Sequence, residues 1–154
     1  MTNDLGPGDE WRIEMQGRHR IWIVRGLLLA FGCVLVLIVS AANTGTGHRF
    51  WWFLSGIPMG DKFGHLGLIG TLSLLLNASL RGRRAPGRAA FMMLGSLVLL
   101  IVATLEEGSQ IFIATRTFDV VDWLANVAGI ALGEWCVRLW SRLALRRAVR
   151  AEEA

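Results

Sequence analysis

The sequence is poor in the features that mark soluble enzymes and secreted domains. It holds two cysteines, Cys33 and Cys136, and both lie inside apolar stretches, so no disulfide framework is expected. No glycine-rich phosphate loop, nucleophile elbow or metalloprotease motif occurs in its 154 residues. Charged residues make up only 18% of the chain, and apolar residues come in long runs instead of alternating with polar ones. These absences exclude the common soluble catalytic frameworks and leave the apolar runs to define the protein.

Four apolar runs dominate the chain, at residues 21–42, 63–80, 89–105 and 120–140. Runs of about 18 or more apolar residues predict membrane-spanning helices, because the hydrocarbon core of a bilayer is roughly 30 Å thick. We therefore predict an all-α polytopic membrane protein, whose residues 21–140 form four transmembrane helices in an antiparallel bundle. Residues 1–20 are expected to be a loose cytoplasmic tail, and residues 141–154 a basic, amphipathic cytoplasmic extension of the last helix.

The basic residues alternate between the two sides of the predicted membrane. Thirteen of the sixteen lie in the two terminal segments and the second connection, and the other two connections hold only Arg49, Lys62 and Arg116. Because cytoplasmic loops carry the excess of Lys and Arg, both termini are predicted to be cytoplasmic. The basic charge thus reflects topology and contact with anionic lipids, and no nucleic-acid partner is expected. A cleaved signal peptide is the alternative for residues 21–42, but its apolar part is usually only about 7 to 15 residues long.

Acidic residues gather at the predicted outer ends of three helices. Asp61 precedes the second span, Glu106 and Glu107 end the third, and Asp122 begins the fourth. A charged carboxylate inside a span costs roughly 2.5–3.5 kcal/mol, so such groups are expected to face partners in the bundle interior. Glu106 and Glu107 are about 100° apart on a helix and cannot both point inward, and Glu107 is the one predicted to do so.

Two polar residues lie one helical turn deeper. His65 follows Asp61 by four residues, and Asn126 follows Asp122 by four, so each pair shares a helix face and extends about 6 Å further in. Such positions are too deep to reach the headgroup region, so we expect His65 and Asn126 to make contacts inside the bundle.

Further along the last span, two short patterns predict helix packing. Gly129 and Gly133 continue the face of Asp122 as a small-xxx-small pattern, which predicts that another helix approaches closely. Near the predicted inner end, Glu134 and Arg138 are expected to form an i, i+4 ion pair.

Two stretches resemble the VanZ-like family of small bacterial membrane proteins: "DKFGH" at residues 61–65 and "EGSQIFIATRTFDVVDWLANVAGIALG" at residues 107–133. The positions that match the family pattern are Asp61, Lys62, His65, Glu107, Gln110, Arg116, Asp119, Asp122, Asn126, Gly129 and Gly133. The resemblance covers about half of the chain and departs from the family at "IAT", residues 113–115, where relatives often have a turn with proline. It implies a four-helix domain in the bacterial inner membrane and an accessory role in glycopeptide resistance or envelope biogenesis. It names no reaction.

The first and preferred function is binding of a cell-envelope lipid or glycan headgroup, such as an isoprenoid-phosphate or glycolipid headgroup. The first nine of the matching residues are its candidate ligand-binding residues. Arg116 and Lys62 would contact phosphate or carboxylate, and the acids would contact hydroxyls or amines, in an outward-facing pocket between the helices. A channel is not favoured, because the deep halves of the spans are mostly apolar.

Two other functions remain open. An intramembrane enzyme would use Asp122 or Glu107 as general base and His65 as acid or orienting group. A divalent ion on His65 and the nearby acids is a variant of this hypothesis, but no ligand-spacing motif is matched, and neither a metal nor a cofactor is assigned. A structural protein would instead use the polar residues as a clamp and dock a membrane protein partner of a larger envelope machine.

Overall fold

The structure is a computed structural model, and it describes residues 7–44, 59–113 and 118–153. Within these ranges the chain is helical and contains no β-strand, which confirms the all-α prediction. The long helices are α1 (Pro7–Asn43), α3 (Gly60–Ser79), α4 (Leu94–Ser109) and α5 (Val120–Glu152), and two short 3₁₀ turns are η1 (Gly87–Ala89) and η2 (Gln110–Phe112).

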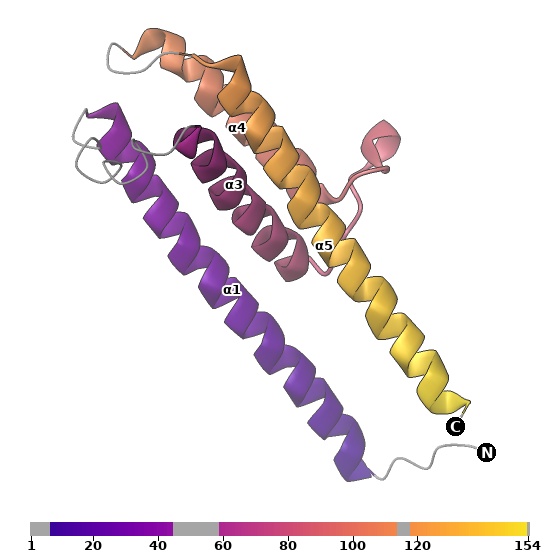
Figure 1. Ribbon diagram of the computed structural model, residues 1–154. Helices are drawn as coiled ribbons and strands as arrows, with labels where there is room; N and C mark the ends of the chain where they lie inside the picture. The colour runs from indigo at the N-terminus through magenta and orange to yellow at the C-terminus, as the bar shows by residue number, and fades with distance from the viewer. Residues whose placement is uncertain (1–6, 45–58, 114–117, 154) are drawn as a thin grey trace.

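The four long helices run alternately up and down (Figure 1). Helix α3 lies in the middle of the arrangement and packs against α1, α4 and α5, and its contact with α5 is the most extensive in the molecule. The start of α1 and the end of α5 lie at one end of the bundle, and the starts of α3 and α5 lie at the other (Figure 1). Side chains from the starts of α3 and α5 therefore meet at the same level.

Three helical stretches in the described part of the chain are long and apolar enough to cross a membrane, His19–Ala42, Leu94–Phe112 and Val120–Ala151. Helix α3 is not among them, although its 20 residues would reach about 30 Å. Its hydropathy is lowered by polar residues that the other helices cover, since Ser73 and Asn77 are completely buried. A central helix needs less apolar surface than helices that face lipid.

Two polar side chains of α3 donate hydrogen bonds to its neighbours, although Asn77 Oδ1 is buried without a hydrogen-bond partner among the described residues. The Ser73 hydroxyl donates to the carbonyl of Ile130 on α5 at 2.9 Å. The Asn77 amide donates to the hydroxyl of Ser96 on α4 at 2.8 Å. Because a hydrogen bond removes most of the cost of burying a polar group, these two contacts tie α3 to both neighbours instead of weakening the bundle.

Glycines allow α3 and α5 to approach closely, as the small-xxx-small pattern predicts. A Cβ atom on Gly129 would lie 2.6 Å from the carbonyl oxygen of Leu66, and one on Gly133 would lie 2.5 Å from that of Gly70. No side chain fits between backbones at these distances. The close crossing brings the first turns of the two helices, which carry the acidic residues, into direct contact.

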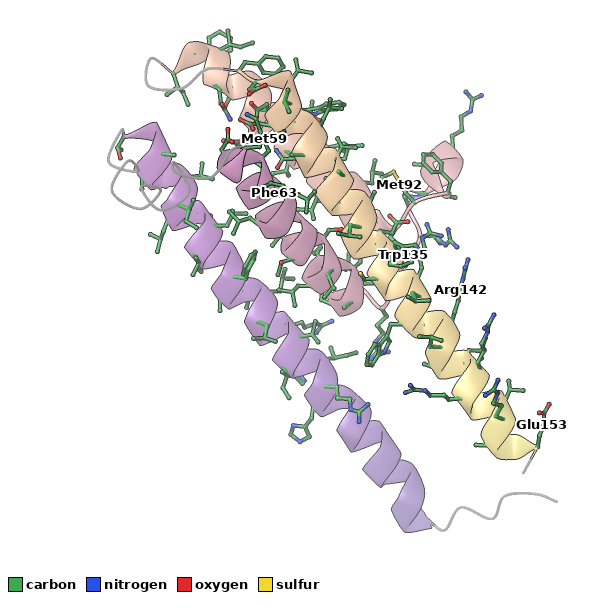
Figure 2. The ribbon with its side chains drawn as sticks, in the orientation of Figure 1. Met59, Phe63, Met92, Trp135, Arg142 and Glu153 are labelled. Atoms are coloured by element: carbon green, nitrogen blue, oxygen red, sulfur yellow. The ribbon has the colours of Figure 1, made fainter. Side chains whose placement is uncertain are left out.

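Two predicted boundaries differ from the structure. Helix α4 begins at Leu94 and not at residue 89, because the chain from residue 83 folds back on itself: Ala85 N donates to Met92 O at 3.0 Å and Leu94 N to Arg83 O at 2.8 Å. Helix α1 begins at Pro7, where proline suits a first helical position, so it includes most of the expected loose tail. Helix α5 continues to Glu152, in line with the predicted extension, and Figure 2 shows Arg142 and Glu153 on the part that passes beyond α3.

Candidate functional site

Lys62 lies at the centre of the candidate site and contacts three aspartates. Its Nζ atom is 2.8 Å from Asp61 Oδ2, 2.5 Å from Asp119 Oδ2 and 2.7 Å from Asp122 Oδ1. The ammonium donates hydrogen bonds to Asp61 and Asp119, whereas Asp122 Oδ1 lies within ion-pair distance without accepting a well-aligned hydrogen bond. We call these four residues the Lys62 cluster. It joins the first turn of α3 to the first turn of α5.

Lys62 is also the only lysine in the chain, among fifteen arginines. An arginine side chain presents its donors in a flat fork that suits one carboxylate or phosphate at a time. A lysine ammonium is compact, and its donors point in three directions. The convergence of three carboxylates on one point explains why lysine occupies this position while arginine serves at the others.

Helix starts place the aspartates where carboxylates are stable. Asp119 is the N-cap of α5, and its Oδ1 accepts a hydrogen bond from Val121 N at 2.8 Å, while Asp122 lies in the first turn. Asp61 lies in the first turn of α3. Unpaired N–H groups and the helix dipole favour negative charge at these positions. The sequence thus gathers acids at two helix starts, and the glycine crossing then brings these starts together.

The contacts of Lys62 shift the pKa values of the cluster. Its hydrogen bond is the main reason that the pKa of Asp61 and the pKa of Asp119 lie below their ordinary values. Burial acts to lower the pKa of Lys62, but the contacts with Asp119, Asp122 and Asp61 together outweigh it, and the pKa is raised well above its ordinary value. Asp61, Asp119 and Lys62 are therefore ionised throughout the neutral range.

His65 and Asn126 meet one turn deeper, as their spacing predicts. His65 Nδ1 lies 3.1 Å from Asn126 Oδ1, and His65 Nε2 lies 3.8 Å from Asp122 Oδ2. Asn126 is almost completely buried. The imidazole thus sits between a carboxylate and an amide, an arrangement that can orient the ring for hydrogen bonding or proton transfer.

Glu107 and Gln110 form the wall of the site on α4. Glu107 is completely buried, which confirms that it points inward. Its Oε1 accepts from Asp119 N at 3.1 Å, and its Oε2 accepts from Gln110 Nε2 at 3.2 Å. Glu107 therefore links the end of α4 to the cap of α5. Eight of the nine predicted site residues belong to one continuous polar network, and the ninth, Arg116, lies outside the described residues.

The described side chains do not form a metal centre. No group of three or more His, Cys, Asp and Glu side chains among them has an arrangement that could hold a metal ion. In the Lys62 cluster, three carboxylates do converge on one point, but the lysine ammonium already occupies it. The structure gives the metal variant of the enzyme hypothesis no support in this part of the chain.

A cavity of about 680 Å³ runs beside the network, between α1, α3 and α4. Along most of its length it is lined by apolar side chains, among them Val39, Leu68, Leu72, Leu99 and Val102. Where α3 begins, its lining is polar and consists of Asp61, His65, Glu106 and Asn126. The cavity therefore has the two-part character of an amphiphile, with a long apolar section and a short polar one.

Sequence reasoning missed two parts of this site. Glu106 lines the cavity and accepts a hydrogen bond from Gln110 Nε2 at 3.3 Å, although only Glu107 was assigned to the site. The signal that could have found it is its i, i+4 spacing from Gln110. The apolar section was also missed, because it depends on the distance between α1 and α4, which no sequence pattern encodes.

A second polar centre lies further along α5. Glu134 Oε1 pairs with Arg138 as predicted, at 2.7 Å from its Nε, and Oε2 accepts from Met93 N at 3.0 Å. Arg138 Nη2 also donates to Phe91 O at 2.6 Å. We call Glu134, Arg138 and these two backbone groups the Glu134 centre. It fixes the turn before α4 against α5.

No protein-family model, curated protein or solved structure matches this chain.

Proposed function

We propose that the chain is a VanZ-like protein of the bacterial inner membrane that binds a cell-envelope lipid. The lipid chain lies in the apolar section of the cavity, and the headgroup lies at Asp61, His65, Glu106 and Asn126. The observation that carries this proposal is the two-part lining of a single cavity. Its volume of about 680 Å³ falls within the range of roughly 300–1,000 Å³ that is typical of ligand pockets.

The proposal includes the orientation of the bundle in the membrane. All four long helices cross it, with α3 as the shielded central span, and both termini lie in the cytoplasm. The excess of arginines in the first half of α1, in the last part of α5 and in the α3–α4 connection supports this orientation. The polar section of the cavity then faces the outer surface, where envelope lipids present their headgroups. An accessory role in envelope biogenesis or glycopeptide resistance fits this location.

The polar residues of the site would have two separate roles, holding the helices in place and contacting the headgroup. The Lys62 cluster and Glu107 hold the starts of α3 and α5 and the end of α4 in place. His65 and Asn126 line the cavity and offer hydrogen bonds to a headgroup. Lys62 itself does not line the cavity and contacts the three aspartates, so direct contact with a ligand falls to the other residues.

Native mass spectrometry of protein extracted in a mild detergent tests the proposal. Val39→Trp would fill the apolar section from α1 without touching the α3–α5 crossing. Leu37→Trp is the matched control, because Leu37 lies on the same helix, is 69% exposed and does not line the cavity. We expect a bound lipid in the wild-type protein and in Leu37→Trp, and at least a roughly tenfold loss in Val39→Trp. Equal lipid occupancy in all three proteins, or none in the wild type, would refute lipid binding in the cavity.

A structural role is the second candidate, favoured by the three-aspartate contact of Lys62 that ties two helices together. His65→Gln separates the two functions, because His65 lines the cavity and lies outside the Lys62 cluster. If the residues serve a ligand, this variant loses lipid while its melting temperature changes little. If they serve only as a clamp, occupancy and melting temperature fall together. The acid–base hypothesis rests on His65 beside Asp122 and would require turnover that disappears in His65→Gln.

A further inference from the structure

The apolar section of the cavity has an open side, which determines how a ligand can reach it. We propose that the lipid enters the cavity sideways from the outer leaflet of the bilayer, through an opening between α1 and α4. This inference rests on the proposed lipid-binding function. It adds the route by which the cavity is loaded and the kind of lipid that this route admits.

Two valines form the rim of the opening. Val36 on α1 and Val102 on α4 both line the cavity, yet they are 64% and 54% exposed. Leu99 and Ala103 line the same cavity from α4 and are only 6% exposed each. The cavity therefore has a buried floor and an exposed rim, with one rim residue on each of the two helices.

The depth of the cavity matches one leaflet of a bilayer. Its lining on α3 runs from Gly60 to Leu72, a rise of about 18 Å at 1.5 Å per residue. The hydrocarbon core of a bilayer is roughly 30 Å thick, so the cavity reaches to about its middle. Val36 and Val102 belong to the apolar stretches His19–Ala42 and Leu94–Phe112. In the proposed orientation, the opening therefore faces the lipid chains of the outer leaflet and not water.

Helix α1 is the wall of the cavity that is least firmly attached. None of its residues from His19 to Ala42 is buried, and its extensive contact among the described elements is with α3 alone. Buried side chains instead join the other three helices, as in the hydrogen bond from Asn77 to Ser96 and that from Asp119 N to Glu107. Elements with few buried contacts move at a lower free-energy cost than the core does. A shift of α1 would therefore widen the opening while α3, α4 and α5 stay together.

The open side also determines which lipids fit. A lipid that enters sideways has to place only one chain in the cavity, because its remaining hydrocarbon can stay in the bilayer beyond Val36 and Val102. A closed pocket would have to enclose the whole tail. The ligand class is therefore a lipid of the outer leaflet whose hydrocarbon exceeds the cavity, through a second chain or a tail of greater length.

A removable bridge across the opening tests the route. Val36→Cys and Val102→Cys are combined, with Cys33→Ser and Cys136→Ser to remove the native thiols, and the pair is cross-linked with a bismaleimide that contains a disulfide. The protein, carrying its co-purified lipid, is then diluted into lipid-free detergent micelles. Native mass spectrometry follows the loss of the lipid over time. Only lipid that is absent from Val39→Trp is counted as bound in the cavity.

We expect the bridge to lengthen the half-time of lipid loss at least about tenfold, and reduction of the disulfide to restore it. Val36→Cys alone, treated with the same reagent, carries the bulk without the bridge and is the control. A second comparison needs no cross-linking. Val102→Trp should slow the loss, whereas Ile101→Trp should not, because Ile101 is 52% exposed on the same helix and does not line the cavity.

An unchanged half-time in the bridged protein, or failure of the two cysteines to cross-link, would overturn sideways entry and leave lipid binding in the cavity intact. A bound species whose mass shows a single chain short enough to lie wholly inside the cavity would overturn the lipid class in the same way. If the wild type carries no lipid that Val39→Trp removes, the proposed function fails, and the inference fails with it.

Discussion

The Glu134 centre and the Lys62 cluster compensate their buried charges in different ways. The Glu134 centre pairs one carboxylate with one guanidinium and uses backbone groups for the remaining hydrogen bonds. The Lys62 cluster gives one ammonium three carboxylates and borders a cavity. Among the described residues, the Glu134 centre thus pairs charges one to one, whereas the Lys62 cluster has more carboxylates than cations. Under the proposed function, the Glu134 centre serves the fold alone, and the Lys62 cluster also positions the cavity's polar section.

The largest effect is expected where one change separates the two helices that the Lys62 cluster joins. Gly129→Leu would place side-chain atoms where a Cβ already meets Leu66 O at 2.6 Å and Gly70 N at 3.0 Å, so α3 and α5 must separate. Gly67→Leu is the matched control on α3, because a Cβ there has nothing within 4 Å. We expect loss of well over 3 kcal/mol of stability, or no folded protein, for Gly129→Leu and a near-normal melting temperature for Gly67→Leu. Similar melting temperatures for the two variants would contradict the close crossing.

Breaking the balanced centre should cost stability without affecting the ligand. Glu134→Ala leaves the Arg138 guanidinium and Met93 N without their acceptor, and removal of one partner of a buried pair costs roughly 3–5 kcal/mol. We expect a lower melting temperature in detergent, with lipid occupancy per folded molecule unchanged. A selective loss of lipid at normal stability would show that the two centres are not separable in the way described.

Removing the cation of the unbalanced centre should have a smaller effect that ions can reverse. Lys62→Ala leaves three carboxylates facing one another around an empty space, but water reaches Asp61 and relieves part of the repulsion. We expect a moderate decrease in melting temperature that added Ca²⁺ partly restores, because converging carboxylates bind hard cations. Wild-type protein, in which the ammonium fills that space, is the control and should show no stabilisation by Ca²⁺.

The smallest effect is the dependence of stability on pH that the Lys62 cluster contributes. Because the pKa values of Asp61 and Asp119 are depressed in the folded state, their stabilisation is present above about pH 4 and lost as pH falls through the folded values. The pKa of Lys62 is raised, so its contribution is full below about pH 10 and is lost only as pH rises through the higher folded value. Melting temperatures should form a plateau between these limits. In Lys62→Ala, acidification should instead cause little loss, because protonation removes repulsion.

Helical spacing was enough to predict which residues of the site share a face. The four-residue steps from Asp61 to His65 and from Asp122 to Asn126 follow from 3.6 residues per turn, and so does the choice of Glu107 over Glu106 as the inward residue. The glycine pattern gave the partner-facing side of α5 in the same way. These are properties of single helices, which local sequence determines.

The rest of the site depends on distances between helices, which the spacing of residues along the sequence does not determine. The sharing of Lys62 by three aspartates needs the register of α3 against α5, and the cavity needs the separation of α1 from α4. Hydropathy predicted α3 as a span like the others, but its polar side chains bond to neighbouring helices that only the fold brings near. The late start of α4 likewise follows from backbone hydrogen bonds in the preceding turn.

Because Lys62 is the only lysine, its Nζ is the single side-chain amine of the protein. An amine must be deprotonated and accessible before it reacts with an acylating reagent. The three carboxylates keep the Lys62 amine protonated and shield it from the reagent. Acylation at residue 62 therefore reads out how often α3 and α5 separate at this end of the bundle. The rate of acylation at Lys62 would therefore report the separation of α3 from α5 without an introduced label.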